Sequence, residues 1–113
     1  MGTKPQSKMF KLRSHRPGDI GYITYRHAIF YSKAYGFDTT FDAYVASGLS
    51  QFVMQYDPRK EHLWVAEDET TPVGSIAIVK KEEAEAQLRW FLVELQARGR
   101  GLGKKLLYEA IKF

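Results

Sequence analysis

Three glycines at alternate positions lie directly before an amphipathic segment, with basic residues among and after them. They fall in the run ARGRGLGKKLLYEAIKF, residues 97–113. Successive backbone N–H groups in such a turn converge on one point, and the N-terminus of a following helix adds about half a positive charge. Phosphate is the group that this arrangement suits. The residue types therefore predict a diphosphate site. The spacing of the glycines must show which known phosphate-binding motif it matches.

Two common phosphate-binding motifs do not fit the spacing. A Walker A loop needs glycine five residues before its Gly-Lys pair and Ser or Thr after the lysine. Here Arg98 lies five residues before Gly103, and Lys105 stands in the Ser/Thr position. The dinucleotide fingerprint G-x-G-x-x-G fails because Lys104 replaces its last glycine. Both nucleoside triphosphate hydrolysis and dinucleotide binding are therefore disfavoured.

The rest of the sequence predicts the elements that position this turn. Segments with the period of a helix alternate with segments that have the two-residue period of a strand. The expected elements are a strand at Met9–Arg13, helices at Ile20–Tyr35 and Phe41–Tyr56, strands at His62–Glu67, Pro72–Lys81 and Ala86–Glu94, and a helix at Leu102–Phe113. This order, βααβββα, predicts an α/β fold with a mixed sheet, in which the three consecutive strands form an antiparallel meander.

Local signals predict the helix ends and the place of the last strand. Asp19 is expected to cap the first helix, and Gly36 to end it in a left-handed conformation. Thr39 or Thr40 is expected to cap the second helix. The strand at Ala86–Glu94 carries apolar residues at both alternating sets of positions. It is therefore expected to be a central strand, covered by helices on both faces.

The turn at Arg98–Gly103 reads R-x-x-G-x-G and links the last strand to a helix. It resembles the pyrophosphate loop of the GNAT superfamily of N-acetyltransferases, whose pattern is Q/R-x-x-G-x-G/A. The element order agrees with the first part of that fold over residues 9–113, lacking its C-terminal strands and fourth helix. Residues 1–8 are expected to be a flexible leader. The segments HRPGDIGYITYRHAIFYSKAYGFD and LRWFLVELQARGRGLGKKLLYEAIKF also look like the acetyltransferase domain of MarR-GNAT fusion proteins.

The resemblance implies an acetyl-CoA site on the turn and on the backbone of the preceding strand. The implied cofactor-binding residues are Phe91, Leu92, Val93, Arg98, Gly99, Arg100, Gly101, Gly103 and Lys104. Family members often carry proline at the position of Leu95. The implied activity is transfer of the acetyl group to a primary amine, either on a small molecule or on a protein. A domain that lacks the later elements is expected to be poorly active alone.

Catalytic and acceptor residues are less clearly marked. Glu94 and Glu85, at opposite ends of the last strand, are candidate bases for the acceptor amine, although both also fit as surface glutamates. Gln87 occupies a position where the family often has glutamate. In the family the first two helices border the acceptor site, so His27 and Tyr31 are candidate acceptor contacts. An aromatic stripe on a helix is also typical of core packing.

Composition sets limits on these hypotheses. The chain has 113 residues and no cysteine, which excludes disulfides, thiolate zinc sites and cysteine nucleophiles. No metal site is expected, because no cluster has the spacing of metal ligands. Without a signal peptide or membrane-spanning stretch, the protein is expected to be cytoplasmic. An unpaired strand edge would favour a homodimer.

The net charge leaves a second function open. Lysine and arginine exceed the acidic residues by four, which favours anionic partners. With Trp64, Trp90 and many tyrosines, this composition also fits a basic nucleic-acid or protein-binding module without catalysis. The aromatic residues follow the spacing of a core rather than that of a basic stripe, so the acetyltransferase hypothesis is favoured.

Overall fold

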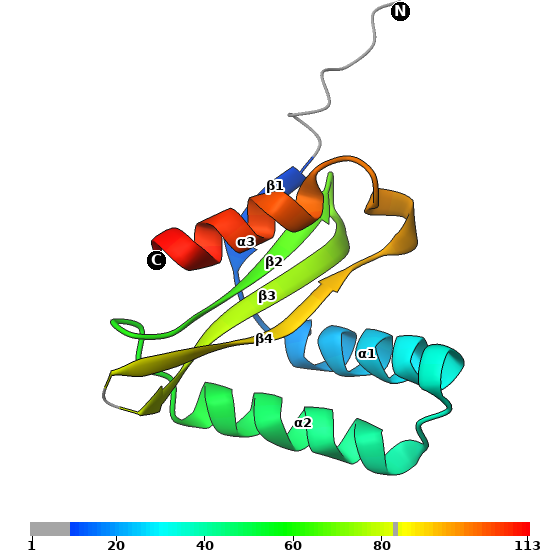
Figure 1. Cartoon of the computed structure of the whole chain (residues 1–113), viewed down its shortest axis with the longest axis horizontal. Coiled ribbons are helices and arrows are strands. Elements are labelled where there is room, and N and C mark those ends of the chain that lie inside the picture. The colour runs from blue at the N-terminus through cyan, green and yellow to red at the C-terminus, as the bar shows by residue number, and fades with distance from the viewer. Residues whose placement is uncertain (1–9, 83) are drawn as a thin grey trace, which may run out of the picture. The chain divides into compact units, whose positions relative to one another are not determined.

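The computed structural model of the protein describes residues 10–82 and 84–113 (Figure 1). Its elements are β1 (Phe10–Ser14), α1 (Asp19–Tyr35), α2 (Thr39–Met54), β2 (His62–Asp68), β3 (Thr71–Glu82), β4 (Glu85–Val93), the 3₁₀ turn η2 (Leu95–Ala97) and α3 (Leu102–Lys112). The predicted order βααβββα is confirmed. The expected leader at residues 1–8 and the start of the first strand at Met9 lie outside the described residues.

The chain forms two compact units. Among the described residues, the sheet unit contains residues 10–15 together with those of Lys60–Phe113, and the helical unit contains Arg16–Arg59. Neither unit includes, among residues 10–82 and 84–113, a helix that is long and apolar enough to cross a membrane.

The sheet unit is an antiparallel meander in the order β1-β2-β3-β4, as the sequence predicts. Short turns join β2 to β3 and β3 to β4, which is the connection that antiparallel neighbours allow. Leu12 lies opposite Ala66 in the β1–β2 pair, and Trp64 lies opposite Ile76 in the β2–β3 pair. These pairings bring apolar side chains of neighbouring strands side by side.

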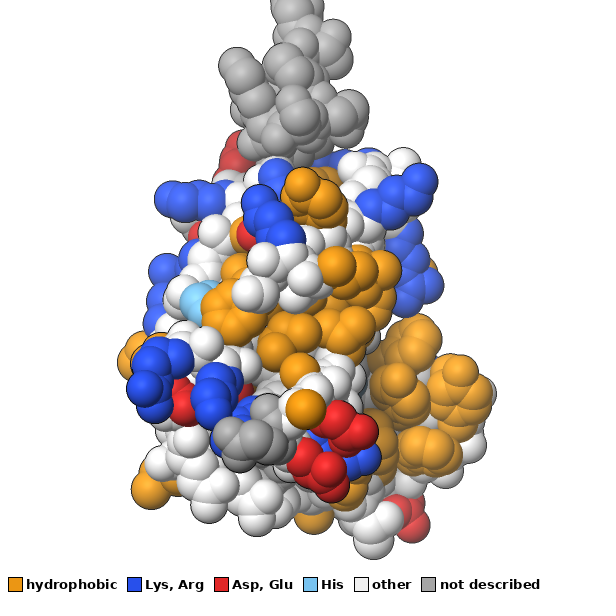
Figure 2. Space-filling view, turned by 60° about the vertical axis from the view of Figure 1, so that its left-hand side comes forward, with side chains coloured by type: hydrophobic (Ala, Val, Ile, Leu, Met, Phe, Trp, Pro, Cys, Tyr) orange, Lys and Arg blue, Asp and Glu red, His pale blue; other side chains and the backbone are white. Residues whose placement is uncertain are grey.

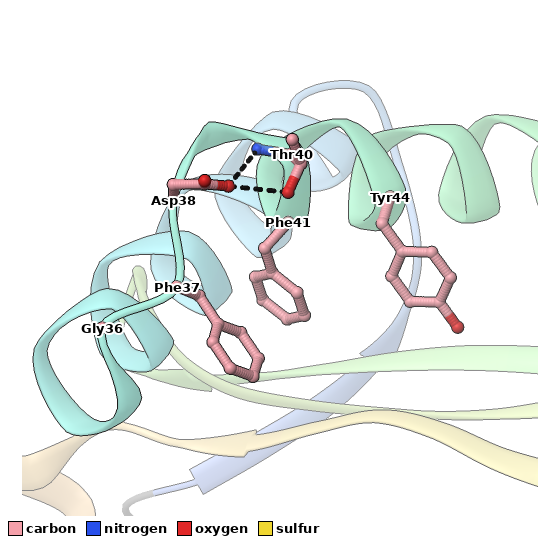
Figure 3. Close-up of a pocket in the computed structure, with 6 residues that line it drawn as sticks. All are labelled: Gly36, Phe37, Asp38, Thr40, Phe41 and Tyr44. Carbon is pink, nitrogen blue, oxygen red and sulfur yellow. Dashed lines mark hydrogen bonds between the residues drawn. The ribbon is translucent and has the colours of Figure 1, made fainter.

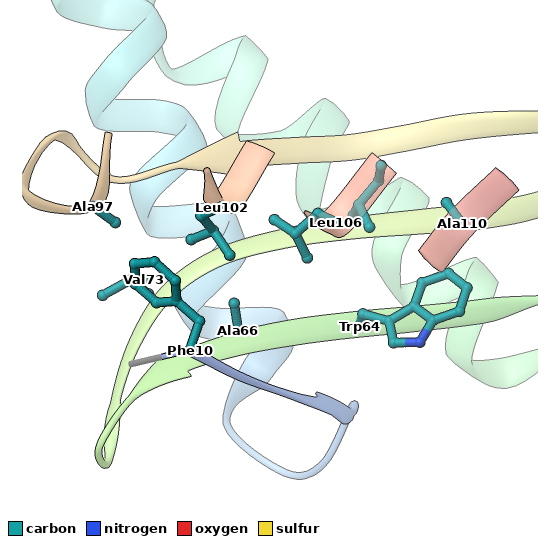
Figure 4. Close-up of a cluster of buried hydrophobic side chains, with 9 residues drawn as sticks. Phe10, Trp64, Ala66, Val73, Ala97, Leu102, Leu106 and Ala110 are labelled. Atoms are coloured by element: carbon teal, nitrogen blue, oxygen red, sulfur yellow. The ribbon is translucent and has the colours of Figure 1, made fainter. Parts of the chain in front are cut away.

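One face of α3 packs on this sheet (Figure 4). Leu102, Leu106 and Ala110 follow one another at four-residue steps, so they share one side of the helix. The buried cluster is Phe10, Trp64, Ala66, Val73, Ile76, Ala97, Leu102, Leu106 and Ala110. Gly74 permits the close approach: a Cβ there would lie 2.9 Å from the carbonyl oxygen of Leu92 and 3.2 Å from each of two leucine methyls of α3.

The position of β4 corrects the expectation of a central strand. Within the described part of the chain, β4 pairs with β3 alone and forms an edge of the sheet. Trp90 and Leu92 are buried, but Leu88 and Phe91 are each 44% exposed. The prediction of a central strand from the apolar pattern is wrong, because apolar side chains of an edge strand can also remain open to solvent.

The helical unit is a hairpin of α1 and α2. Gly36 ends α1 in a left-handed conformation (φ 73°), as predicted. The expected N-caps are wrong by one residue. Gly18 precedes α1, whereas the Asp19 carboxylate accepts from the backbone N–H of Arg16. The α2 cap is Asp38, because its carboxylate reaches the N–H of the second helical residue, two positions along the chain.

Candidate cofactor site and aromatic pocket

The glycine turn between β4 and α3 has a backbone that only glycine adopts easily. Gly99 and Gly101 have φ angles of 78° and 84°, in the left-handed region where a Cβ is strained. A Cβ at either position would meet no atom within 4 Å. The backbone conformation, rather than crowding, therefore explains these two glycines.

The N-terminus of α3 presents donors that the helix does not use. The first intrahelical bond runs from the N–H of Lys105 to the carbonyl of Gly101, at 3.1 Å. The N–H groups of Leu102, Gly103 and Lys104 precede it and have no partner within the helix. Gly101, at the N-cap position, has no side chain that could accept from them. The turn therefore has the donors and the helix dipole that an anion needs.

Gly103, in the first turn of α3, lies next to β4. A Cβ at this position would lie 3.9 Å from both Phe91 Cζ and Val93 Cγ2, which is ordinary van der Waals contact. The structure therefore brings the start of α3 next to Phe91 and Val93. The two parts of the predicted cofactor site, one from the turn and one from the strand, meet here.

The outer edge of β4 offers backbone groups beside this point. The N–H of Glu94 donates to the carbonyl of Val73 at 2.9 Å, so it faces β3. Because antiparallel residues alternate between facing the partner strand and facing away, the backbone groups of Val93 and Phe91 point outward and those of Leu92 point to β3. Of the three residues, two thus carry the outward groups that a ligand's amides could pair with.

A β-bulge just before Phe91 determines which backbone groups at the end of β4 face β3 and which face outward. Ser75 pairs with Leu92 but Ala77 pairs with Arg89, so β4 contains one extra residue. Trp90 lies at the bulge with φ 51°, which is strained for a residue with a side chain. The buried Ser75 hydroxyl donates to the Trp90 carbonyl at 2.6 Å. This bond stabilises the bulge from the neighbouring strand.

The basic residues of the turn differ in their surroundings. Arg98 donates through Nε to the carbonyl of Val93 at 3.0 Å. Arg100 is 3.4 Å from the Asp68 carboxylate, and its guanidinium lies over the Phe10 ring at 4.6 Å. Lys104 is exposed at the start of α3. Arg98 and Arg100 therefore contact the protein itself, while the exposed side chain of Lys104 lies in the first turn of α3; a contact of any of the three with phosphate stays a prediction.

Comparison with known proteins shows the family. The profile of the Acetyltransferase (GNAT) family matches residues 28–113. The chain belongs to the GNAT acetyltransferase family. No curated protein sequence matches it.

Solved GNAT structures share the fold. An acetyltransferase from Streptococcus agalactiae is 20% identical (TM-score 0.68), and the match covers 93% of this chain and 65% of that one. Glucosamine-6-phosphate N-acetyltransferase from Arabidopsis thaliana is 17% identical (TM-score 0.59; 93% and 74% covered). A Clostridium acetobutylicum protein solved with acetyl-CoA is 16% identical (TM-score 0.65; 92% and 72% covered). The chain thus spans slightly less than two thirds of the Streptococcus protein.

The two candidate bases of this GNAT chain lie at opposite ends of β4. Glu85 begins the strand and is exposed, whereas Glu94 follows its last residue and is 8% exposed. Nine steps at about 3.3 Å each separate them by roughly 30 Å. They cannot serve the same acceptor. Glu94 is the one beside the glycine turn and the outer edge of β4.

The candidate acceptor residues are packed within the helical unit. His27 is buried, and its Nδ1–H donates to the carbonyl of Ile23 at 2.9 Å. Its ring stacks on Tyr31 at a centroid distance of 6.2 Å. Tyr31 is half-buried and also contacts Phe41 at 4.9 Å. These contacts give both residues a structural role, and their acceptor role stays a prediction.

The same unit contains a pocket that sequence reasoning missed (Figure 3). It has a volume of about 450 Å³ and is lined by Gly36, Phe37, Asp38, Thr40, Phe41 and Tyr44. We refer to these six residues as the aromatic pocket. The signal in the sequence is the run GFDTTFDAY after the helix-ending glycine, in which three aromatic residues accompany two acidic ones.

Proposed function

We propose that this GNAT chain binds acetyl-CoA at the start of α3 and takes part in the transfer of its acetyl group to a primary amine. The observation that carries the proposal is the meeting of the two parts at Gly103, where the unused N–H groups of the helix adjoin the outer edge of β4. A diphosphate and an amide-containing arm, joined in one ligand, match these two parts. The relative solved with acetyl-CoA supports this choice of ligand.

Each part of the ligand has its own protein groups. The N–H groups of Leu102, Gly103 and Lys104, with the Lys104 ammonium, are proposed to hold the pyrophosphate. The outward backbone groups of Phe91 and Val93 are proposed to pair with the pantetheine amides, as an added strand would. Arg98 donates to the Val93 carbonyl, so it must release this oxygen or leave only the N–H of Val93 for the ligand.

Acetyl-CoA supplies a thioester. When the amine attacks its carbonyl carbon, an amide bond forms and the bond to sulfur breaks. The coenzyme A thiolate leaves and takes up a proton. The attacking amine must give up a proton. We propose Glu94 as its acceptor, directly or through water, because Glu94 follows the outward part of β4. Glu85 is assigned no role, because it lies at the far end of the strand.

Substitution of Gly103 tests the cofactor site. The Gly103→Ala variant adds a Cβ that the fold accepts at 3.9 Å, and the family pattern also accepts alanine here. Its affinity for coenzyme A should stay within about threefold, because the added contact is ordinary. The Gly103→Leu variant places a bulky side chain beside Phe91 and Val93, where the two parts of the proposed site meet, and should bind at least about tenfold more weakly, equal to 1.4 kcal/mol. Calorimetry on folded variants measures both.

A charge reversal provides a second test that does not depend on packing. Lys104→Glu places an acid in the first helical turn, where it favours the helix but repels a diphosphate. Lys81→Glu makes the same change in net charge at an exposed residue of β3. Only the first should weaken binding of coenzyme A. Equal affinities of Gly103→Leu, Lys104→Glu and the unchanged protein would remove the turn from the site.

Amine-dependent release of thiol from acetyl-CoA tests the transfer itself. Glu94→Gln should slow the release by about a hundredfold, the smaller end of what a positioned base contributes. It should leave the affinity for coenzyme A unchanged. No release with any of a panel of small amines and lysine peptides, despite tight binding, would overturn transfer by this chain but not the cofactor site.

We also propose that two copies of the chain associate through β4. This strand is an edge of the described sheet, and Leu88 and Phe91 leave apolar surface beside it. On the face shown in Figure 2, hydrophobic side chains reach the surface between Lys and Arg side chains. Edges of this kind pair with other strands. Light scattering should give twice the mass of 13.0 kDa, with coenzyme A shifting the mass toward the monomer because it uses the same edge. A monomer at every concentration would contradict the proposal.

A further inference from the structure

The aromatic pocket combines ring faces with a single charge. The ring of Phe41 lies 5.0 Å from that of Phe37 and 6.2 Å from that of Tyr44, measured between centroids. In Figure 3 the three rings extend on the same side of the backbone. Phe37 and Tyr44 are 44% and 63% exposed. The pocket therefore offers solvent-accessible π surface around a space large enough for a small molecule.

Asp38 is the charged member of the lining. Its carboxylate accepts from the Thr40 hydroxyl at 2.6 Å and from the Thr40 N–H at 2.9 Å. These two hydrogen bonds, first that of the side chain and then that of the backbone, lower the pKa of Asp38 below its ordinary value. The group is therefore anionic at neutral pH.

The charge and the rings select the same kind of occupant. An anion would face the Asp38 carboxylate, and the N–H of Thr40 at the start of α2 already donates to that carboxylate. A neutral apolar molecule would gain the rings but would cover a carboxylate without pairing it. A cation with an apolar body satisfies both, because the face of an aromatic ring attracts positive charge.

We propose that the aromatic pocket binds an organic ammonium ion, with its apolar part on Phe37 and Phe41 and its nitrogen toward Asp38 and the ring faces. The binding of the cation stands by itself. It does not depend on the proposed acetyl transfer.

A matched pair of probes tests the pocket on the full chain without acetyl-CoA. Choline and 3,3-dimethylbutan-1-ol have the same shape, but only choline carries a positive charge. Titration followed by NMR of the aromatic protons should show choline bound at least about tenfold more tightly than the alcohol. Equal affinities, or no binding of choline to the folded protein, would overturn the proposal.

Variants then assign the binding to these residues. Asp38→Asn keeps a good N-cap while removing the charge, and Phe41→Leu keeps apolar volume while removing the ring face. Each should reduce the affinity for choline about fivefold or more, while the affinity for coenzyme A stays unchanged. Asp42→Asn on α2 and Tyr25→Leu on α1 likewise remove one carboxylate and one aromatic ring, but outside the pocket lining, and should leave choline binding unchanged. Equal losses in the controls would contradict the assignment.

The outcomes separate this proposal from the proposed function. Choline binding without coenzyme A binding would keep the pocket and overturn the cofactor site. Coenzyme A binding without choline binding would do the reverse.

Discussion

The sheet unit and the helical unit build their candidate sites from different parts of the chain. The cofactor site is made mainly of backbone: N–H groups at the start of α3 and the outward groups of β4. The aromatic pocket is made of side chains carried by a turn and one helix. A backbone site depends on conformation at a few glycines, whereas a side-chain site can change with single substitutions that leave the fold intact. The backbone site is the one proposed for a ligand with a fixed diphosphate, and the side-chain site is the one proposed for an organic cation.

One glycine in each unit shows that the two units also differ in how much room the backbone leaves for a side chain. Gly74 in β3 is needed because the backbone of β4 and two leucines of α3 leave no room for a Cβ. Gly21 in α1 has no atom within 4 Å of the position of a Cβ. The same methyl group should therefore have opposite effects in the two units.

The largest expected effect follows from this pair. Gly74→Ala should lower the free energy of unfolding by roughly 1–3 kcal/mol, because the Cβ would lie 2.9 Å from the Leu92 carbonyl and one layer must move. Gly21→Ala should raise it by roughly 0.5–1 kcal/mol, because alanine is the better helix former. Urea unfolding of the two variants measures both, and a stabilised Gly74→Ala would show that α3 packs on the sheet less closely than the structure has it.

A smaller loss is expected from Ser75→Ala, which tests the bulge. Removal of the hydroxyl leaves the buried Trp90 carbonyl without this donor, at a cost of about 1–2 kcal/mol. Affinity for coenzyme A should fall as well, because the bulge sets which groups of β4 point outward. Ser50→Ala, at an exposed position of α2, is the matched control; it should leave the affinity unchanged and should not lower stability, because alanine is the better helix former. Loss of stability without any loss of affinity would limit the bulge to a structural role.

Two left-handed glycines allow a comparison at equal strain. Gly101→Ala in the sheet unit and Gly36→Ala in the helical unit both place a Cβ at positive φ in open space. Each should cost about 1 kcal/mol of stability. Only Gly101→Ala should weaken coenzyme A binding, measured by calorimetry at a temperature where both variants are folded. Equal weakening by both would mean that the effect is general destabilisation.

The difference between the units also explains what the sequence could predict. The spacing of Gly99, Gly101 and Gly103 carries the cofactor hypothesis, because the left-handed conformation at Gly99 and Gly101 favours glycine and so leaves a local signature in the sequence. The left-handed Trp90 leaves none, since its conformation depends on the pairing of β4 with β3 and on the Ser75 hydroxyl. The edge position of β4 was missed for the same reason: pairing is a tertiary property that the apolar pattern of one strand does not contain.

The aromatic pocket was missed for another reason. Phe37 and Phe41 have the residue types and spacing of ordinary packing residues, and only the structure shows that they line an open space. Asp38 was overlooked as a cap because Thr39 and Thr40 are equally good candidates by type. In the structure α2 begins at Thr39, so its cap is Asp38, one residue before the first candidate. An error of one or two residues is usual for a helix boundary predicted from sequence.

The smallest expected effect is a pH dependence in the sheet unit. His62 packs on Trp64 at 4.4 Å, and its Nε2 lies 2.9 Å from the Ser14 hydroxyl. Burial, and secondarily His15, lower its pKa below 6.5. The unfolded chain therefore binds a proton on His62 more readily than the folded chain, so its contribution to stability is complete above pH 6.5 and is lost as pH falls through the folded pKa. In urea unfolding from about pH 8 to about pH 5, His62→Gln should show a shallower loss of stability than the unchanged protein. Parallel profiles would mean that other groups cause the acid sensitivity, and a steeper loss in the variant would show that His62 prefers its charged form when folded.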